Sequence, residues 1–169
     1  DHFVISRKFY LYVCFIVFGI SQTPDHLIFY RISTGEYYEA VEIMNPTNED
    51  IHLGDYYITD ATKPADRSSY YNLPSGENFW SESISDFIAR FPDTTIAAGG
   101  SFTLSFHDSS MYFNYYDEYP DFSLFGNMRN AIEGETTISI GPNFVDHVKL
   151  SNPEVLILFK WEEDDSLVQ

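Results

Sequence analysis

Hydrophobic and polar residues alternate along two runs between Tyr37 and Ile58. In the first run, Val41 and Ile43 fall on the same face of a predicted strand, because strand side chains alternate with a period of two. Proline has no N–H for a β-ladder, so Asn45-Pro46 ends this strand. The second run predicts a strand that bends at Gly54-Asp55. The whole stretch therefore predicts two strands joined by a polar turn.

Similar short runs occur along much of the chain. Phe102, Leu104 and Phe106 alternate after Gly99-Gly100, a pair of residues typical of a tight turn. Many short alternating strands separated by turns favour an all-β sandwich in a single domain. The other predicted strands are His26–Ser33, Thr95–Phe106 as a hairpin, Thr136–Ile140, and Glu154–Lys160 as a buried central strand.

The segment from Asp60 to Pro92 departs from the strand pattern. Its apolar residues recur at i, i+3, i+4 and i+7, which predicts one face of a short helix. Ser83 and Asp86 resemble a capping box, and Pro92 ends the helix. We expect this helix to pack against an edge of the sandwich. The apolar positions are Ile84, Phe87, Ile88 and Phe91, and a further helical turn is possible at Met111–Tyr116.

The N-terminal residues have the pattern of a secretory signal peptide. Arg7 and Lys8 precede the apolar run Phe9–Ile20, and polar residues follow it. Small residues at the −3 and −1 positions, Gly19 and Ser21, predict cleavage after Ser21. The run is shorter than the roughly 18–20 residues of a spanning helix. The alternative is a buried first strand or core helix. We therefore expect a signal peptide at 1–21, a secreted or cell-surface domain at 22–169, and no membrane insertion after cleavage.

Charge and cysteine content narrow the functional classes. The formal charge of −17 opposes binding to nucleic acid and to anionic membranes. Solubility explains such a charge, and attraction of divalent cations or of a basic partner is the functional alternative. The single cysteine, Cys14, lies in the apolar run, so the mature domain would fold without disulfides. This agrees with a cytosolic protein and also with a secreted bacterial protein whose core is large enough without them.

Four segments along the chain carry family-type motifs. The first is Ala40–Thr47, which contains Glu42, Asn45 and Pro46, and the second runs from Ile51 to Ile58 and contains Gly54. The third is Thr95–Leu104, which contains Gly99, and the fourth is the closing hairpin from Leu150 to Val168. In this order the four segments resemble the motifs of lamin-tail domains. The resemblance covers about Leu27 to Gln169, with insertions near 60–94 and 108–148. Tyr56 or Tyr57 stands where the family commonly has tryptophan.

This resemblance implies an immunoglobulin-like β-sandwich that serves as an interaction module without catalysis of its own. In bacteria such domains occur on secreted or surface proteins, often beside hydrolases. The motif residues would have structural roles, and Asn45 in particular is expected to hydrogen-bond the turn that follows it. The final strand is short, so we expect the natural protein to continue beyond Gln169.

Residues with catalytic or metal-binding chemistry form no recognised motif. The sequence His107-Asp108-Ser109-Ser110 contains the residue types of a triad, but triads are usually assembled from separate loops. Asp117, Glu118 and Asp121 offer the oxygen ligands of Ca²⁺ without the alternating pattern of a calcium loop. We expect no cofactor; Ca²⁺ is chemically possible in this loop, and a solvated acidic loop is the alternative.

Aromatic residues are unusually abundant at 18%, including 13 Tyr. Exposed aromatics beside acids can stack on sugars or anchor a protein partner, and core packing is the alternative use. We therefore predict a non-enzymatic module that contacts a protein or cell-surface component, including glycans. The alternatives are an accessory or metal-dependent part of a secreted nuclease or phosphatase, and a carbohydrate-binding sandwich. The candidate contact residues are Trp80, Tyr112, Tyr115 and Tyr116.

Overall fold

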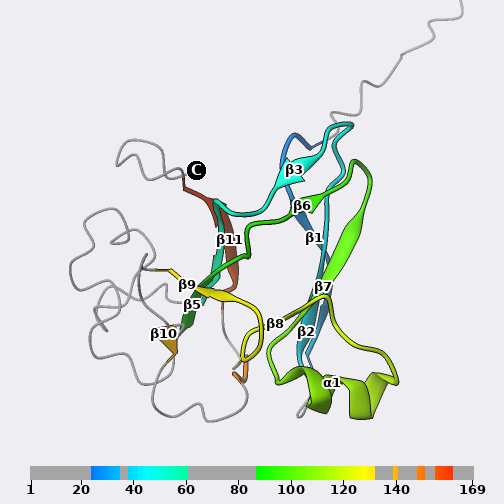
Figure 1. Cartoon of the computed structure of the whole chain (residues 1–169), viewed down its shortest axis with the longest axis vertical. Coiled ribbons are helices and arrows are strands. Elements are labelled where there is room, and N and C mark those ends of the chain that lie inside the picture. Colours follow the sequence, from blue (N-terminus) through cyan, green and yellow to red (C-terminus); the bar gives the residue numbers. More distant parts are fainter. Residues whose placement is uncertain are drawn as a thin grey trace, which may run out of the picture.

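The structure is a computed structural model that describes residues 24–34, 38–60, 87–131, 139–140, 148–150 and 155–161. These residues form strands with one short helix, which agrees with the predicted all-β class (Figure 1). The elements are β1 (Ile28–Ser33), β2 (Ala40–Met44), β3 (Ile51–His52), β4 (Tyr56–Thr59), β5 (Phe87–Arg90), β6 (Thr95–Ile96), β7 (Ser101–Ser105), α1 (Ser109–Tyr116), β8 (Phe122–Ser123), β9 (Arg129–Asn130), β10 (Ser139–Ile140) and β11 (Ile157–Lys160).

The described strands pair into three sheets. One has the order β1-β2-β7-β8, in which only the β7–β8 pair is parallel. A second has the order β10-β5-β4-β11, and β9 also pairs with β5. The third consists of β3 and β6. Figure 1 shows β1, β2 and β7 on one side of the molecule and β4, β5 and β11 on the other.

The two larger sheets share one hydrophobic core. Val41 and Ile43 of β2 point into it and are fully buried, as the alternating pattern predicts. Ile58 of β4 belongs to the same cluster. Phe91 meets Phe102 edge to face, with 5.3 Å between ring centroids. The core therefore lies between the inward faces of both sheets.

The strand predicted across Gly54-Asp55 is two strands in different sheets. β3 pairs with β6, whereas β4 pairs with β5 and β11. Between them the chain turns, with the Tyr56 N–H donating to the Leu53 carbonyl at 2.9 Å. The predicted Thr95–Phe106 hairpin is also wrong in its pairing, because β6 and β7 bond to different neighbours. Its turn is present at Gly99, whose φ of 69° suits glycine.

The helix predicted over Ile84–Phe91 is wrong in the part that the structure describes, because Phe87–Arg90 is strand β5. All four of its side chains are buried, whereas a surface helix would expose Ala89 and Arg90 on its polar face. The Arg90 side chain is accommodated because it donates to the Gly54 carbonyl and lies over the Tyr57 ring. Because both faces of β5 are buried, its residues do not show the alternation of apolar and polar positions that a half-exposed strand has.

Two further expectations concern the second half of the chain. The turn predicted at Met111–Tyr116 is the helix α1, so a short helix does lie in the second insertion. Strand β11 is at an edge of its described sheet rather than at its centre, and it is only half-buried. Of the strand predicted at Thr136–Ile140, β10 covers the last two residues.

Several expectations fall outside the described residues. They are the signal peptide at 1–21, the contact residue Trp80, the proposed cap at Ser83 and the last part of the closing hairpin, from 162 to 168. Among the helices in the described ranges, none has the length and apolarity needed to cross a membrane.

Candidate functional site

Helix α1 begins and ends at aspartates. The Asp108 carboxylate accepts from the Ser110 N–H at 2.8 Å and from the Ser110 hydroxyl, which is the geometry of an N-cap. These hydrogen bonds lower the pKa of Asp108, the side-chain bond most. At the other end, Asp117 is left-handed (φ 58°) and its N–H donates to the Phe113 carbonyl at 2.8 Å, as in common helix C-caps. Asp108 of the triad-like sequence is thus a helix cap.

Three tyrosines recur at helical spacing in α1, and a fourth lies in the loop that follows. Tyr112, Tyr115 and Tyr116 are at i, i+3 and i+4 and so lie on one side of the helix, whereas Tyr119 comes after the helix ends. Tyr112 is buried, with only 4% of its surface exposed. The Tyr116 hydroxyl donates to the Tyr38 carbonyl at 3.2 Å and so ties α1 to the residues before β2.

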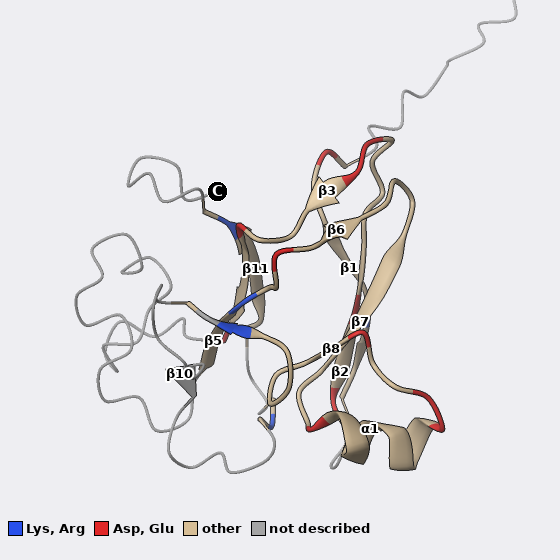
Figure 2. Ribbon diagram, in the orientation of Figure 1, with Lys and Arg blue, Asp and Glu red and all other residues tan. Residues whose placement is uncertain are grey.

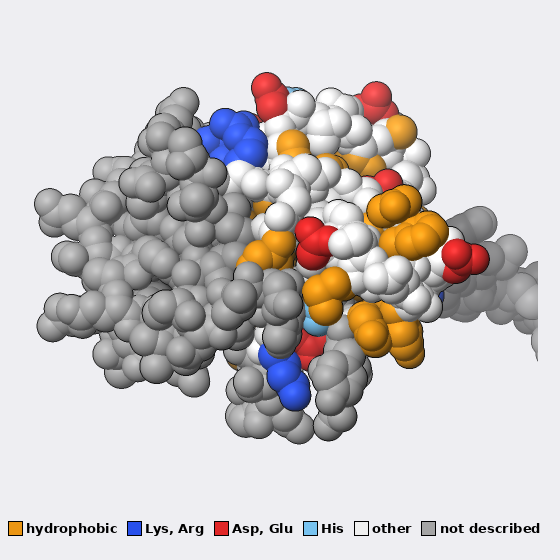
Figure 3. Space-filling model, turned by 60° about the horizontal axis from the view of Figure 1, so that its bottom comes forward, with side chains coloured by type: hydrophobic (Ala, Val, Ile, Leu, Met, Phe, Trp, Pro, Cys, Tyr) orange, Lys and Arg blue, Asp and Glu red, His pale blue; other side chains and the backbone are white. Residues whose placement is uncertain are grey.

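Two aromatic stacks hold the outer tyrosines in place. Tyr115 stacks on Tyr38 with ring centroids 4.0 Å apart, and Tyr119 stacks on Phe113 at 4.5 Å. Tyr115 is nevertheless 59% exposed and Tyr119 67% exposed. Each ring is therefore held by a stacking partner and still exposes more than half of its surface. We define the tyrosine surface as the two stacked pairs together with Tyr116, that is, Tyr38, Phe113, Tyr115, Tyr116 and Tyr119. Figure 3 shows hydrophobic side chains gathered on this face of the molecule, with acidic side chains between them.

A small pocket of about 160 Å³ lies beside the tyrosine surface, where α1 meets the outward face of β1, β2 and β7. Arg31, Glu42 and Thr103 are paired across the three strands and form part of its wall. Arg31 and Glu42 make an ion pair at 3.2 Å. We call this the Tyr112 pocket; it is lined by Arg31, Ser33, Ala40, Val41, Glu42, Thr103, Tyr112, Tyr116 and Glu118.

Tyr112 brings a hydroxyl group to this pocket from a largely buried ring. The hydroxyl has no hydrogen-bond partner among the residues that the structure describes. Burial raises the pKa of Tyr112 above the usual 10.0, and the negative charge of Glu118 raises it further, while Arg31 acts in the opposite direction. The phenol therefore lies close to charged groups of the pocket and stays protonated at neutral pH.

The Tyr112→Phe variant tests this environment. A raised pKa in the folded state means that the unfolded chain loses its proton first, so stability falls as pH rises above about 10. Without the hydroxyl, this contribution disappears. We expect equal stability of both proteins at neutral pH and a shallower loss for the variant as the pH rises above about 10, measured by urea unfolding. Parallel losses in the two proteins would contradict the raised pKa.

The three carboxylates considered for Ca²⁺ have separate environments. Asp117 caps α1, and the Asp121 carboxylate accepts from the Thr103 N–H at 2.8 Å, which fixes the loop after α1 to β7. Glu118 lines the Tyr112 pocket. Within the described ranges, no three His, Cys, Asp or Glu side chains come together as a metal site. The described residues thus give no support to a Ca²⁺ site in this loop.

Asn45 joins two turns at the other end of the sheet. Its fully buried amide Nδ2 donates to the carbonyls of Glu49, Ile96 and Ala97 at 2.8–3.3 Å. Its Oδ1 accepts from the Thr47 N–H and hydroxyl. The hydrogen bonds to the following turn that the sequence predicts are therefore present. They extend to the turn between β6 and β7, 51 residues away in the chain.

The other motif residues support the same framework. Glu42 accepts from Arg31 and from the Ser101 hydroxyl at 3.2 Å. Gly54 lies so close to His52 that a Cβ would meet the imidazole at 2.7 Å. Pro46 follows Asn45 in the turn after β2.

A larger hollow of about 590 Å³ lies at the opposite end of the molecule from α1. Asp25, Glu49 and Asp50 give it an acidic rim, and no described aromatic residue lines it. In the turn that lines this hollow, the Glu49 carbonyl already accepts hydrogen bonds from the Asn45 amide and the Thr47 hydroxyl. This hollow is acidic but has no aromatic ring in its described lining, whereas the tyrosine surface has aromatic rings with acidic residues beside them.

Comparisons with protein-family models, with curated proteins and with solved structures find no match to this chain.

The sequence indicates Tyr112, Tyr115 and Tyr116 as contact residues but not their partners. Tyr38 carries no local signal, because it precedes a strand and is 78 residues away from Tyr116 in the sequence. The helical spacing of Tyr112, Tyr115 and Tyr116 is the signal that places these three on one side of a helix. Trp80 is outside the described residues.

Proposed function

We propose that this chain is a non-catalytic interaction module, in which an immunoglobulin-like sandwich of the lamin-tail type presents the tyrosine surface to a partner. The two sheets with a common core support the sandwich, and the order of the four sequence motifs supports the lamin-tail type. The observation that carries the function is the pair of aromatic stacks, Tyr38–Tyr115 and Phe113–Tyr119, whose outer rings remain exposed.

Exposed and ordered tyrosines suit binding for two reasons. Each ring offers a large apolar face with a polar hydroxyl, and such residues dominate the affinity of protein interfaces. Stacking also restricts the rotamers before a partner arrives, so less conformational entropy is lost on binding. The stacks therefore support a preformed contact surface.

The position of the surface agrees with the usual division between scaffold and site. α1 and its loop lie in an insertion, and binding residues commonly lie on loops that a rigid scaffold positions. With the predicted signal peptide at 1–21, the module would act outside the cell or on its surface. Its partner would be a protein or a cell-surface component, and sugar rings are the alternative ligand for the same tyrosine faces.

A matched pair of variants on ligand arrays tests this function. Tyr119 and Tyr30 are exposed to nearly the same extent, 67% and 65%, but Tyr30 is on β1 and outside the tyrosine surface. On peptide and glycan arrays, we expect Tyr119→Ala to lose at least about fivefold in signal, as for a ring that contributes about 1 kcal/mol. Tyr30→Ala should keep the signal of the unmodified protein. Absence of binding on both arrays, or equal losses in the two variants, would contradict the proposal.

A further inference from the structure

Acidic side chains surround the tyrosine surface. Asp108 and Asp117 bound α1, and Glu118 and Asp121 follow. Figure 2 shows acidic residues at both ends of α1, and basic residues at β5, at β9, at the end of β11 and in the segment 148–150. Of the basic residues in the described ranges, only Arg31 lines the Tyr112 pocket, and it is paired with Glu42. The charge of Glu118 is therefore left without compensation in the pocket wall.

The size of the Tyr112 pocket limits what can enter it. Sites for small molecules usually enclose about 300–1,000 Å³. At about 160 Å³, this pocket suits the head group of one side chain better than a whole organic ligand. The neighbouring tyrosine surface would then contact the rest of the ligand.

The polar groups of the pocket favour a hydrogen-bond donor with positive charge. Glu118 is an acceptor when ionised, and the Tyr112 hydroxyl has an oxygen that no described residue uses. Tyr116 adds an aromatic ring to the wall, and exposed Tyr115 is next to it. A guanidinium group has five N–H donors and binds both carboxylates and aromatic faces, whereas an ammonium group is a strongly hydrated point charge.

Charge complementarity also decides which class of macromolecule suits the tyrosine surface as a partner. A second copy of the chain would bring another formal charge of −17. Acidic peptides and phosphates would meet the same repulsion. A neutral glycan could stack on the rings and donate hydroxyl hydrogens to Glu118, but it would bring no positive charge to offset the acidic residues. A cationic peptide segment uses the rings, the carboxylates and the Tyr112 hydroxyl together.

We infer that the partner is a protein with an exposed arginine-rich segment, which lies along the tyrosine surface and inserts one guanidinium into the Tyr112 pocket. This inference rests on the proposed function of the tyrosine surface. The guanidinium pairs with Glu118, donates a hydrogen bond to the Tyr112 hydroxyl oxygen and packs against Tyr116. Neighbouring arginines of the segment lie on Tyr115 and Tyr119.

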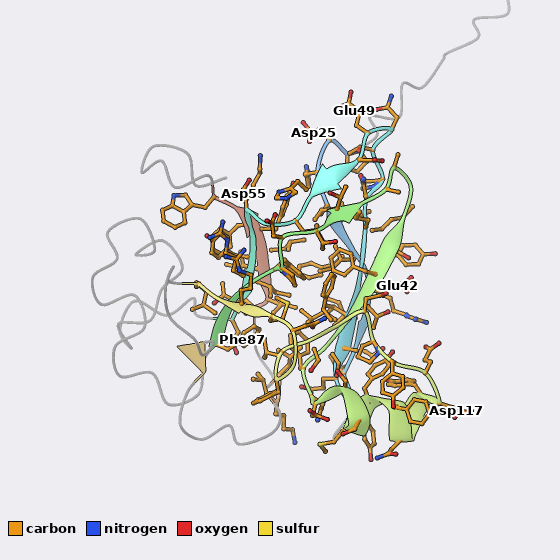
Figure 4. All side chains as sticks on the ribbon, in the orientation of Figure 1. Asp25, Glu42, Glu49, Asp55, Phe87 and Asp117 are labelled. Atoms are coloured by element: carbon orange, nitrogen blue, oxygen red, sulfur yellow. The ribbon has the colours of Figure 1, made fainter. Side chains whose placement is uncertain are left out.

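The test measures the Kd of fluorescein-labelled peptides by anisotropy at physiological ionic strength. The probe alternates arginine with serine, and the comparison peptide has lysine in place of arginine. Glu118→Gln removes the charge in the pocket. Its matched control is Glu49→Gln, which changes the net charge equally at the opposite end of the molecule, where Figure 4 labels Glu49 far from Asp117. Tyr112→Phe removes the hydroxyl.

We expect the arginine peptide to bind more tightly than the lysine peptide. Glu118→Gln should raise its Kd about tenfold and Tyr112→Phe about threefold, since hydrogen bonds to charged groups are strong. Glu49→Gln should raise it less than about twofold, because a distant surface charge is screened by salt. Equal effects of Glu118→Gln and Glu49→Gln would overturn the inference, because attraction would then be diffuse.

The arrays separate failure of the inference from failure of the proposed function. Binding of glycans or neutral peptides through Tyr119, without binding of the arginine probe, would overturn the inference and leave the proposed function standing. Absence of binding to the probe and to both arrays would overturn both.

Discussion

Replacing Ala89 by lysine is expected to lower the free energy of unfolding by about 4 kcal/mol or to prevent folding, because unpaired buried charges are among the most destabilising changes known. Ala89 is in the middle of β5, fully buried, with β4 on one side and β9 on the other. A lysine there would bury an ammonium group in the shared core. Urea unfolding followed by circular dichroism measures the effect.

This substitution also distinguishes the observed strand from the helix that the sequence predicts. In a helix with Phe87, Ile88 and Phe91 on its buried stripe, position 89 would face solvent and tolerate lysine. The control is Ala98→Lys, in the exposed turn before Gly99. We expect the control to change stability by no more than about 0.5 kcal/mol. Similar, small effects at both alanines would show that β5 is misplaced.

Replacing Asn45 by alanine is expected to cost about 3 kcal/mol, which corresponds to a fall in Tm of about 10 °C. The amide makes five hydrogen bonds from a fully buried position. Its removal leaves backbone groups of the two turns without this partner. Thermal unfolding by differential scanning calorimetry measures the change in Tm.

The control for this variant is Asn48→Ala, in the same turn. Asn48 has the same chemistry but lies outside the buried network that Asn45 forms. Its substitution should change Tm by less than about 2 °C. If Asn45→Ala were equally mild, the amide would not hold the β2–β3 and β6–β7 turns together, and the structural role of this motif residue would be wrong.

The parts of the fold that the sequence predicted are those governed by local patterning. β2 was predicted because Val41 and Ile43 alternate with polar residues on a half-exposed strand, and it ends before Asn45-Pro46 as expected. The turn at Gly99 follows from the Gly-Gly pair, which is typical of tight turns, and the structure gives Gly99 the positive φ that favours glycine. Each of these depends on a few neighbouring residues.

The errors come from long-range pairing. Four consecutive buried residues in β5 have no alternation, so an apolar helical stripe fitted them equally well. β6 and β7 are adjacent in sequence, but each finds a better partner in a strand far from it. The same limit applies to the candidate site, because the Tyr38–Tyr115 stack depends on the packing of α1 against the sheet.

Hydrogen–deuterium exchange with and without the best-binding array ligand tests most directly whether the tyrosine surface is the binding site. We predict slower exchange of amides at 109–121 and 38–42, which include α1, its loop and the start of β2. Exchange should not change in the turns at 45–50 and 97–100, at the opposite end of the sheet. Slower exchange confined to those turns, with none at α1, would contradict binding through the tyrosine surface.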